Sequence, residues 1–487
     1  MQNITFYSTN DKLHKQSFES ALLCGMAPDY GLYMVDKKDL PFFSEDKLES
    51  MREMSYAQIA FEVLNPFLGA EIPEEKLCAL LEDAYDSKKI PTKIQLVTDG
   101  IYIMWLTEGP TYSFKDYAAR FFGRALNYFL GVRELKRTVV VATSGDTGGA
   151  VADALLGLDN VDCVVFYPKG SISEGQRRQM TTLQGNIFAF EVNGDFDVCQ
   201  ALAKNLLGDK DFAKNVFGDN DRLTSANSIS VGRLLPQAVY PFFAYSKIKR
   251  ERGQEFIASI PSGNFGDMMG TVLAKNMGLP VSKIVCGVNE NTEFPDFLNS
   301  GKYVVSASKK SPSSAMIVSH PSNLARLIDL YGGHMFDERD PISKKVLREG
   351  VLDKGPNLDK MKEDIFSISV NNDEHFSTIK KVFDLYKVVL DPHGAVGWCA
   401  LEKYFNKNPK RLSVIYETAD PGKFPIDVKK AVGFKPDLPK GMQKQFALPE
   451  RIFSINNSPL ESATGLKLSD SQLAEAKEKL LQIFVKK

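Results

Sequence analysis

The chain has 487 residues, too many for one ordinary hydrophobic core, so we expect roughly two to four domains. Hydrophobic residues make up 43% of it and charged residues 25%, a balance that excludes a disordered chain. With 60 basic and 61 acidic residues the net charge is -1, so no overall field favours nucleic acid or a membrane surface, and small molecules are the expected partners.

The segment from residue 1 to about 95 is predicted to be a mainly helical accessory domain. Residues 45–67 and 73–89 are helix-like stretches that mix acidic and basic side chains. The opening residues lack the apolar core of a signal peptide, and no apolar run approaches the roughly 20 residues of a membrane span. We therefore expect a cytoplasmic protein.

From about residue 96 to 435 the pattern changes to strands that alternate with helices. The apolar strand-like runs lie at 138–142, 161–168, 187–192, 256–260 and 284–288. This alternation predicts an α/β fold with two parallel-sheet domains, a smaller one over about 111–250 and a larger one from the remainder. Ligands of such sheets bind at the carboxyl ends of the strands.

The last part of the chain carries three further features. Residues 290–385 are richer in Ser, Asn and Pro and are predicted to elaborate the larger domain. A strand-like run at 412–417 leads into the polar turn TADPGKF. The segment 436–487 is predicted to be a C-terminal extension that ends in a helix with Ser469 as its N-cap.

The six cysteines are scattered along the chain. They form no CxxC motif, and no His stands near them at metal-ligand spacing. We therefore expect unpaired thiols in a reducing compartment, and no metal site.

Lys115 lies in TEGPTYSFKD, directly after Phe114. Most lysines are solvated surface charges, and that is the default interpretation of any one of them. The aromatic and apolar residues around Lys115 favour partial burial instead, which lowers the pKa of an amine and makes it a better nucleophile. Such an amine can hold an aldehyde cofactor as a Schiff base.

Two glycine-rich loops each follow a strand-like run and precede a helix-like one. They are TSGDTGG at 143–149 and SGNFG at 262–266. Helix-start amides, together with the hydroxyls of Thr143, Ser144 and Thr147, could hold an anion, although a plain capped turn explains such a loop about equally well when it stands alone. Two such loops indicate two anion sites, one for a cofactor and one for a substrate. Neither is a P-loop, and GxGxxG, GxSxG and HExxH are absent from the sequence.

The motifs, taken in order, resemble the threonine synthase family. Seven follow one another as in that family: EGPTYSFKD, TSGDTGG, SANSISVGR, SGNFGD, SHPSN, DPHGAVG and ETADPGKF. The opening FYSTN and SFESALLCGMAPDYGLYM are similar to its N-terminal domain, so the resemblance covers nearly the whole chain. It implies a pyridoxal 5'-phosphate (PLP) enzyme with the fold of the tryptophan synthase β-subunit.

The resemblance also implies which residues bind the cofactor. Lys115 matches the lysine that forms the internal aldimine, beside Phe114, and Thr418 matches the hydroxyl at the pyridine nitrogen. Asp146 lies where related sequences often have Asn near the phenolic oxygen of the cofactor, and its protonation state is open. The loop whose amides bind the cofactor phosphate corresponds to Gly263, Asn264, Phe265 and Gly266.

Substrate contacts are implied in the same way. Thr143, Ser144 and Thr147 match ligands of the substrate's phosphate or carboxylate. Asn227 and Arg233 match further ligands of its phosphate. The family's NSINWAR-like segment reads NSISVGR here, which keeps both of these residues but loses bulk between them, and this departure bears on the shape of the pocket.

The implied reaction converts O-phospho-L-homoserine and water to L-threonine and phosphate, the last step of threonine biosynthesis, in a monomer or small homo-oligomer with no nucleic-acid or membrane partner. One alternative is a serine/threonine dehydratase of the same fold. Asn227 and Arg233 argue against it, because free serine carries no phosphate. The other alternative is a noncatalytic, threonine synthase-like binding protein, against which the intact Lys115 and Thr418 argue.

Two histidines and one basic run are expected to have structural roles only. His393 and His320 are predicted to support a turn or a helix cap, because Lys115 already supplies a base. The basic run at 247–252 is expected to be the solvated last turn of a helix.

Overall fold

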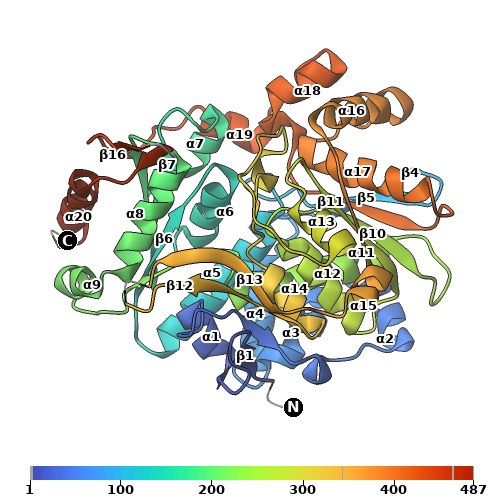
Figure 1. Cartoon of the computed structure of the whole chain (residues 1–487), viewed down its shortest axis with the longest axis horizontal. Helices are drawn as coiled ribbons and strands as arrows, with labels where there is room; N and C mark the ends of the chain where they lie inside the picture. Colours follow the sequence, from blue (N-terminus) through green and yellow to red (C-terminus); the bar gives the residue numbers. More distant parts are fainter. Residues whose placement is uncertain (1–3, 343, 463–464, 486–487) are drawn as a thin grey trace. The chain divides into compact units, whose positions relative to one another are not determined.

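The computed structural model describes residues 4–342, 344–462 and 465–485 (Figure 1). The chain divides into two compact units. Unit 1 comprises Met1–Ala118 and Ser228–Asp437, and unit 2 comprises Ala119–Asn227 and Leu438–Lys487. Each unit contains its own parallel sheet, so the predicted α/β class is confirmed. Helix α5 (Lys115–Val132) carries the chain from unit 1 into unit 2.

A six-stranded sheet organises unit 1, in the order β14-β11-β10-β15-β5-β4. Its strands are β4 (Lys93–Thr98), β5 (Ile101–Trp105), β10 (Phe256–Pro261), β11 (Val281–Val288), β14 (Ile365–Ser369) and β15 (Ser413–Glu417). All neighbouring strands are parallel except β4, which pairs antiparallel with β5 at one edge. β10 and β15 are buried along their whole length, as expected for a parallel sheet that is covered on both faces.

Helices pack on this sheet and form the core of unit 1. α17 (Pro392–Phe405) lies against β10, β11 and β15, and α12 (Gly266–Asn276) lies against β10 and β11. Ile103, Ile257 and Trp398 share one buried hydrophobic cluster. The other helices of unit 1 that follow β5 are α10 (Val231–Leu234), α11 (Val239–Lys247), α13 (Glu293–Ser300), α14 (Leu324–Leu330), α15 (Leu358–Asp364), α16 (Asn372–Tyr386) and α18 (Pro425–Val432).

The N-terminal part of unit 1 combines helices with a small sheet. This part was predicted to be mainly helical, and its helices are α1 (Phe18–Cys24), α2 (Glu45–Ser50), α3 (Tyr56–Leu68) and α4 (Glu74–Ala84). The antiparallel sheet has the order β2-β1-β3, with β1 (Phe6–Ser8), β2 (Lys15–Gln16) and β3 (Tyr33–Val35). Strands of two or three residues are too short to show a period-two pattern, so this sheet was not visible in the sequence.

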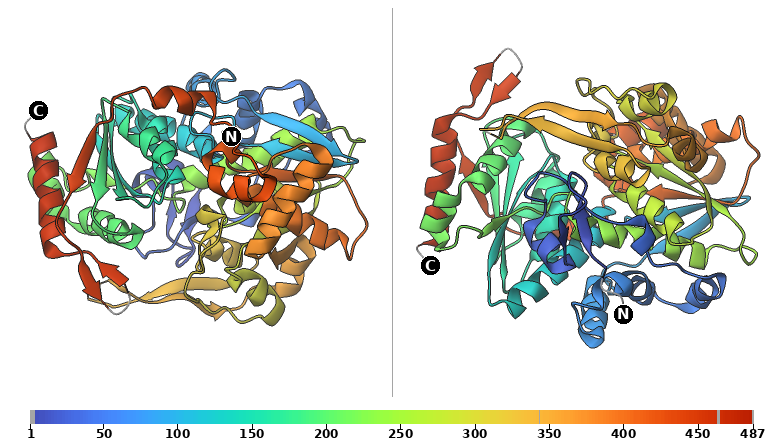
Figure 2. Two further views of the ribbon diagram at one scale, coloured as in Figure 1. Left: turned by 90° about the horizontal axis from the view of Figure 1, so that it is seen from above. Right: turned by 60° about the horizontal axis from the view of Figure 1, so that its bottom comes forward.

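The Ser-, Asn- and Pro-rich stretch at 290–385 contains an antiparallel ribbon. The ribbon pairs β12 (His334–Arg339) with β13 (Val346–Lys354), and Figure 2 shows it in gold, apart from the six-stranded sheet. The ring of His320 lies 3.5 Å from the carboxylate of Asp337 on β12, which fits the structural role predicted for this histidine. The same stretch also supplies β14, which joins the large sheet beside β11.

A five-stranded, fully parallel sheet organises unit 2, in the order β16-β8-β7-β6-β9. Its strands are β6 (Arg137–Ala142), β7 (Val161–Pro168), β8 (Ile187–Val192), β9 (Leu223–Thr224) and β16 (Ile452–Ile455). β6, β7 and β8 confirm three of the predicted strand-like runs. Its other elements are α6 (Asp146–Leu155), α7 (Glu174–Thr181), α8 (Phe196–Gly208), α9 (Lys210–Phe217), α19 (Lys440–Gln445), the hairpin of β17 (Leu460–Ser462) and β18 (Gly465–Lys467), and α20 (Asp470–Phe484).

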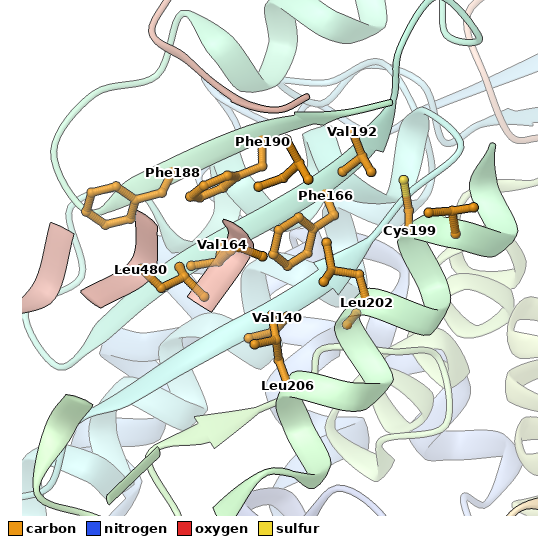
Figure 3. Packing of buried hydrophobic residues seen from close by; sticks show 14 residues of the cluster. Val140, Val164, Phe166, Phe188, Phe190, Val192, Cys199, Leu202, Leu206 and Leu480 are labelled. Carbon is orange, nitrogen blue, oxygen red and sulfur yellow. The ribbon is translucent and has the colours of Figure 1, made fainter. Parts of the chain in front are cut away.

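The core of unit 2 lies between its sheet and helices α8 and α20. Figure 3 shows Phe166 and Phe190 of the sheet beside Leu202 of α8 in one cluster of buried side chains. Leu480 of α20 belongs to the same cluster, so the C-terminal helix is part of this core. The predicted cap of α20 is confirmed, because the Ser469 hydroxyl accepts a hydrogen bond from the third amide of the helix.

In the basic run at 247–252, Lys247, Lys249 and Arg252 are exposed as predicted, but Arg250 is not. The Arg250 side chain is buried rather than solvated, and it donates hydrogen bonds to the Glu49 carboxylate at 2.6 Å and to the Tyr245 carbonyl at 3.0 Å. Lys247, the last residue of α11, donates to two backbone carbonyls of the N-terminal part. Because Glu49 lies 201 residues earlier in the chain, the local charge pattern could not reveal this pairing.

Candidate active site

Three segments predicted to bind the cofactor follow adjacent parallel strands of unit 1. Lys115 follows β5, Thr418 follows β15, and the loop 263–266 follows β10. Two of them are joined directly: the Phe114 amide donates to the Thr418 carbonyl at 2.9 Å, and a β-bridge links the residues on either side of this pair. The carboxyl ends of adjacent parallel strands meet at one edge of a sheet, where α/β proteins bind their ligands.

Lys115 is the first residue of α5, and the turn before it is held firmly. The Asp116 carboxylate accepts from the Thr111 amide at 2.8 Å and contacts the Thr111 hydroxyl, and the Tyr240 hydroxyl donates to the Phe114 carbonyl at 3.1 Å. The side chain of Lys115 is partly buried, as predicted, and its ammonium lies 4.8 Å from the centre of the Phe114 ring. Such a cation-π contact favours a defined position for the amine.

The loop at 263–266 places backbone amides at the start of α12. Phe265 is the N-cap of this helix and has φ +61°. A Cβ on Gly263 would lie 3.0 Å from the Ala315 carbonyl, and one on Gly266 would lie 2.7 Å from the Gln237 amide nitrogen. A Cβ at residue 263 would meet backbone and one at residue 266 would meet the Gln237 side chain, so close packing within unit 1 favours glycine at both positions. The amides that the two glycines leave uncovered at a helix N-terminus suit a phosphate.

Asp267 was missed by the sequence analysis, although SGNFGD contains it. Its carboxyl is buried, and burial raises its pKa to about 6, while the neighbouring Lys115 charge and backbone hydrogen bonds oppose the rise. A carboxyl that titrates near neutrality beside the candidate Schiff-base lysine is characteristic of an active site. The motif alone could not show this, because Asp at the start of a helix is also a common cap.

Replacement of Asp267 by Asn should change the pH dependence of stability. The folded-state pKa near 6 lies above the ordinary value, so the stability that comes from a neutral carboxyl is present below about pH 4 and is lost as the pH rises through 6. The loss is about 2 to 3 kcal/mol for one buried group. The melting temperature of Asp267→Asn relative to the wild type should therefore increase from pH 5 to pH 8.

The matched control for this experiment is Asp384→Asn, because Asp384 is exposed and pairs with Lys380 on α16. Its melting temperature should follow that of the wild type at every pH. A constant difference between Asp267→Asn and the wild type would show that Asp267 does not titrate in this range.

His393 belongs to a buried network. Its Nε2 accepts the Ala315 amide at 3.1 Å, so Nδ1 carries the proton and donates it to the Asp391 carboxylate. Asp391 is also the N-cap of α17, which agrees with the predicted cap role of this region. Burial and the charge of Asp391 raise the pKa of Glu417, the residue before Thr418.

The second glycine loop lies in unit 2, where β6 ends and α6 begins. The Thr143 hydroxyl accepts from the Gly145 and Gly148 amides at 2.9 Å, so it holds the loop in shape. Ser144 is exposed and Thr147 is half-buried. The Asp146 carboxylate accepts from the Gln176 side chain at 3.0 Å.

The SANSISVGR segment spans the boundary between the units. Asn227 is exposed at the end of unit 2. Arg233 lies on α10 in unit 1 and is buried, and burial lowers the pKa of its guanidinium to about 10. A buried guanidinium is a strong candidate for an anion ligand, because charge-assisted hydrogen bonds gain strength away from water.

Comparisons with known proteins identify the family of the chain. The family model "Threonine synthase N terminus" matches residues 5–85, "Pyridoxal-phosphate dependent enzyme" matches 94–355, and "Threonine synthase, C-terminal" matches 394–465. The threonine synthase of Escherichia coli K12 is 33% identical over 462 residues, 95% of this chain and 98% of that protein.

Solved structures agree as well. The PLP-bound threonine synthase of Brucella melitensis superposes with a TM-score of 0.86 at 29% identity, over 99% of this chain and 100% of that one. The yeast threonine synthase gives a TM-score of 0.85 at 29% identity, over 98% of this chain and 99% of that one.

The parallel sheets, the lysine that follows β5 and the glycine loop at the start of α12 define a PLP-dependent enzyme of the α/β type. The residues in unit 1 fit this cofactor, since they offer an amine, a hydroxyl and a run of helix-start amides. Within that class, the chain belongs to the threonine synthase family.

Proposed function

We propose that the chain converts O-phospho-L-homoserine and water into L-threonine and phosphate. The observation that carries the proposal is the convergence of Lys115, Thr418 and the 263–266 loop at the ends of three adjacent strands. The threonine synthases of Escherichia coli, Brucella and yeast, which match this chain over nearly its whole length, support it.

Lys115 carries the proton transfers in this proposal. PLP, when bound, supplies an electron-withdrawing ring that stabilises negative charge on the substrate carbons. The Lys115 amine is tethered on the first residue of α5, within reach of the substrate carbons. It can remove a proton from Cα and one from Cβ, so that phosphate leaves from Cγ. Protons then return to Cγ and to Cα, and water gives its hydroxyl to Cβ and its proton to the released phosphate. Thr418 offers the ring nitrogen a neutral hydroxyl, which moderates the electron-withdrawing effect.

Arg233 is proposed to bind the phosphate of the substrate. Its planar fork of donors matches phosphate oxygens, and its burial removes competing water. We propose Asn227, Ser144 and Thr147 as further substrate ligands. Thr143 was predicted to be one as well, but its hydroxyl is engaged by loop amides, so we propose that it acts by shaping the loop.

The test is a comparison of substrates. O-phospho-L-homoserine should give phosphate and threonine in equal amounts, while kcat/KM for L-serine should be at least about 100-fold lower, because two charge-assisted contacts to the phosphate are each worth roughly 1.5 to 3 kcal/mol. Comparable efficiency on serine would identify a serine/threonine dehydratase instead. Binding of phosphohomoserine without release of phosphate would identify a noncatalytic binding protein.

The location of the protein and its domain boundaries stay predictions. Scattered cysteines support a cytoplasmic location. In the ranges that the structure describes, no helix is long and apolar enough to cross a membrane. An accessory domain over 1–95, a catalytic region over 96–435 and an extension over 436–487 remain our proposed division.

A further inference from the structure

Arg326 is fully buried in unit 1, three residues after Asn323 of the SHPSN motif, which the proposed mechanism does not use. Its three hydrogen bonds go to neutral oxygens. Nε donates to the Tyr33 carbonyl at 2.9 Å, Nη1 to the Asn323 side-chain oxygen at 2.6 Å, and Nη2 to the Ile229 carbonyl at 2.6 Å. None of the described carboxylates lies within ion-pair distance of this guanidinium.

A buried cation without a carboxylate is costly to keep. Burial lowers the pKa of Arg326 to about 9, which reflects the cost of taking the charge out of water. An apolar side chain could fill the same space without this cost. An apolar side chain, however, could not donate hydrogen bonds to three separate segments. The rigid, forked guanidinium of a single arginine can.

The first tie leads to the proposed cofactor-phosphate loop. Asn323, whose side-chain oxygen accepts from Arg326, donates from its side-chain nitrogen to the Asn264 carbonyl at 3.0 Å and from its backbone amide to the same carbonyl at 3.2 Å. The Ser322 amide donates to the Asn264 side-chain oxygen at 3.1 Å. Asn264 is therefore held mainly by the SHPSN segment.

The second tie leads to the proposed substrate-phosphate arginine. Ile229, whose carbonyl accepts from Arg326, directly precedes Ser230, the N-cap of α10. Arg233 lies in this four-residue helix, and its own amide donates to the Ser230 carbonyl at 3.0 Å. The third tie, to the Tyr33 carbonyl, anchors both segments on the small N-terminal sheet.

We propose that Arg326 is a positioning residue. Its hydrogen bonds fix both the cofactor-phosphate loop and the helix that carries Arg233 relative to the N-terminal sheet. The inference rests on the proposed function for the roles of Asn264 and Arg233. This role of Arg326 gives the SHPSN motif and the N-terminal sheet a function: they hold the residues proposed to bind cofactor and substrate, although they contribute no such residue themselves. Loss of Arg326 then weakens the binding of PLP and of the phosphorylated substrate at once.

The main test compares Arg326→Lys with Arg250→Lys. Arg250 is a second buried arginine of unit 1, but it is paired with Glu49 and is tied to neither the 263–266 loop nor the 229–233 segment. Lysine keeps the charge in both variants and loses the fork. For Arg326→Lys we expect at least a fivefold rise in the half-saturating PLP concentration when the resolved enzyme is titrated, and at least a fivefold rise in KM for O-phospho-L-homoserine, with kcat within about threefold of the wild type.

Arg250→Lys should lower the melting temperature of the holoenzyme without either of these changes. If Arg326→Lys lowers only the melting temperature, as Arg250→Lys does, then Arg326 is merely structural and the inference is overturned. If wild-type enzyme does not turn over phosphohomoserine, the proposed function fails, while the PLP titration still decides the link between Arg326 and Asn264.

A second variant keeps the inference testable where Arg326→Lys does not fold. Asn323→Ala removes the 3.0 Å hydrogen bond to the Asn264 carbonyl and a longer one, at 3.4 Å, to the Ser228 carbonyl, but it leaves the hydrogen bond from Arg326 to the Ile229 carbonyl in place. It should therefore raise the half-saturating PLP concentration more than it raises KM. Where Arg326→Lys does fold, the effects of the two substitutions on PLP binding should not multiply in the double variant, because both residues act through the same hydrogen-bonded path. Effects on PLP binding that multiply, or an unchanged PLP titration for Asn323→Ala, would contradict the proposed path.

Discussion

Replacement of Lys115 by alanine is expected to lower kcat for threonine formation by at least about a thousandfold, because proton transfer by a positioned amine contributes roughly 10² to 10⁴ in rate and Lys115 carries more than one such step. Unit 1 places this amine at the start of α5, beside the Phe114 ring and near Asp267. Borohydride treatment of the wild-type holoenzyme, followed by peptide mass mapping, should find the reduced cofactor on Lys115.

The control is Lys380→Ala, since Lys380 is exposed on α16. It should keep both full activity and the label on Lys115. Recovery of the label on any other lysine would refute the proposed role of Lys115, whatever the activity of the alanine variant.

Arg233→Ala should lower kcat/KM for O-phospho-L-homoserine at least tenfold while PLP stays bound. Each charge-assisted hydrogen bond to the phosphate is worth roughly 1.5 to 3 kcal/mol, and about 1.4 kcal/mol corresponds to a factor of ten. Steady-state kinetics give the first quantity, and the absorbance spectrum of the purified variant gives the second. Arg233→Lys, which keeps a charge but not the fork, should fall between the wild type and the alanine variant.

Two results would contradict this role of Arg233. Full activity of Arg233→Ala would remove it from the substrate site. Loss of PLP from that variant, with a normal KM once the cofactor is restored, would place it on the cofactor side instead.

The sequence was most informative where the signal is local. Apolar runs predicted β6, β7, β8, β10, β11 and β15, because a buried parallel strand needs a continuous apolar sequence. Lys115, Thr418 and the 263–266 loop were visible as motifs. Their convergence follows from strand order, in which β10, β15 and β5 are neighbours although β5 lies far earlier in the chain.

The sequence was least informative where burial and distant partners decide a residue's role. Asp267 looks like an ordinary helix cap until its burial is known. Arg326 and Arg250 look like surface charges in the sequence, because each has one acceptor in the distant N-terminal part of the chain, the Tyr33 carbonyl for Arg326 and the Glu49 carboxylate for Arg250. The Thr143 hydroxyl looks available to a substrate, and only the fold shows that loop amides use it.

The edge strand β16 has a consequence for how the protein is made. Its four residues pair in parallel with β8, but all of unit 1 from Ser228 to Asp437 is synthesised between these two strands. During translation β8 is therefore an open sheet edge for the time needed to make that whole stretch, and open edges recruit other chains. Closing so long a loop is also slow. We therefore expect the β8 edge of unit 2 to be open to pairing with other chains until β16 has been synthesised.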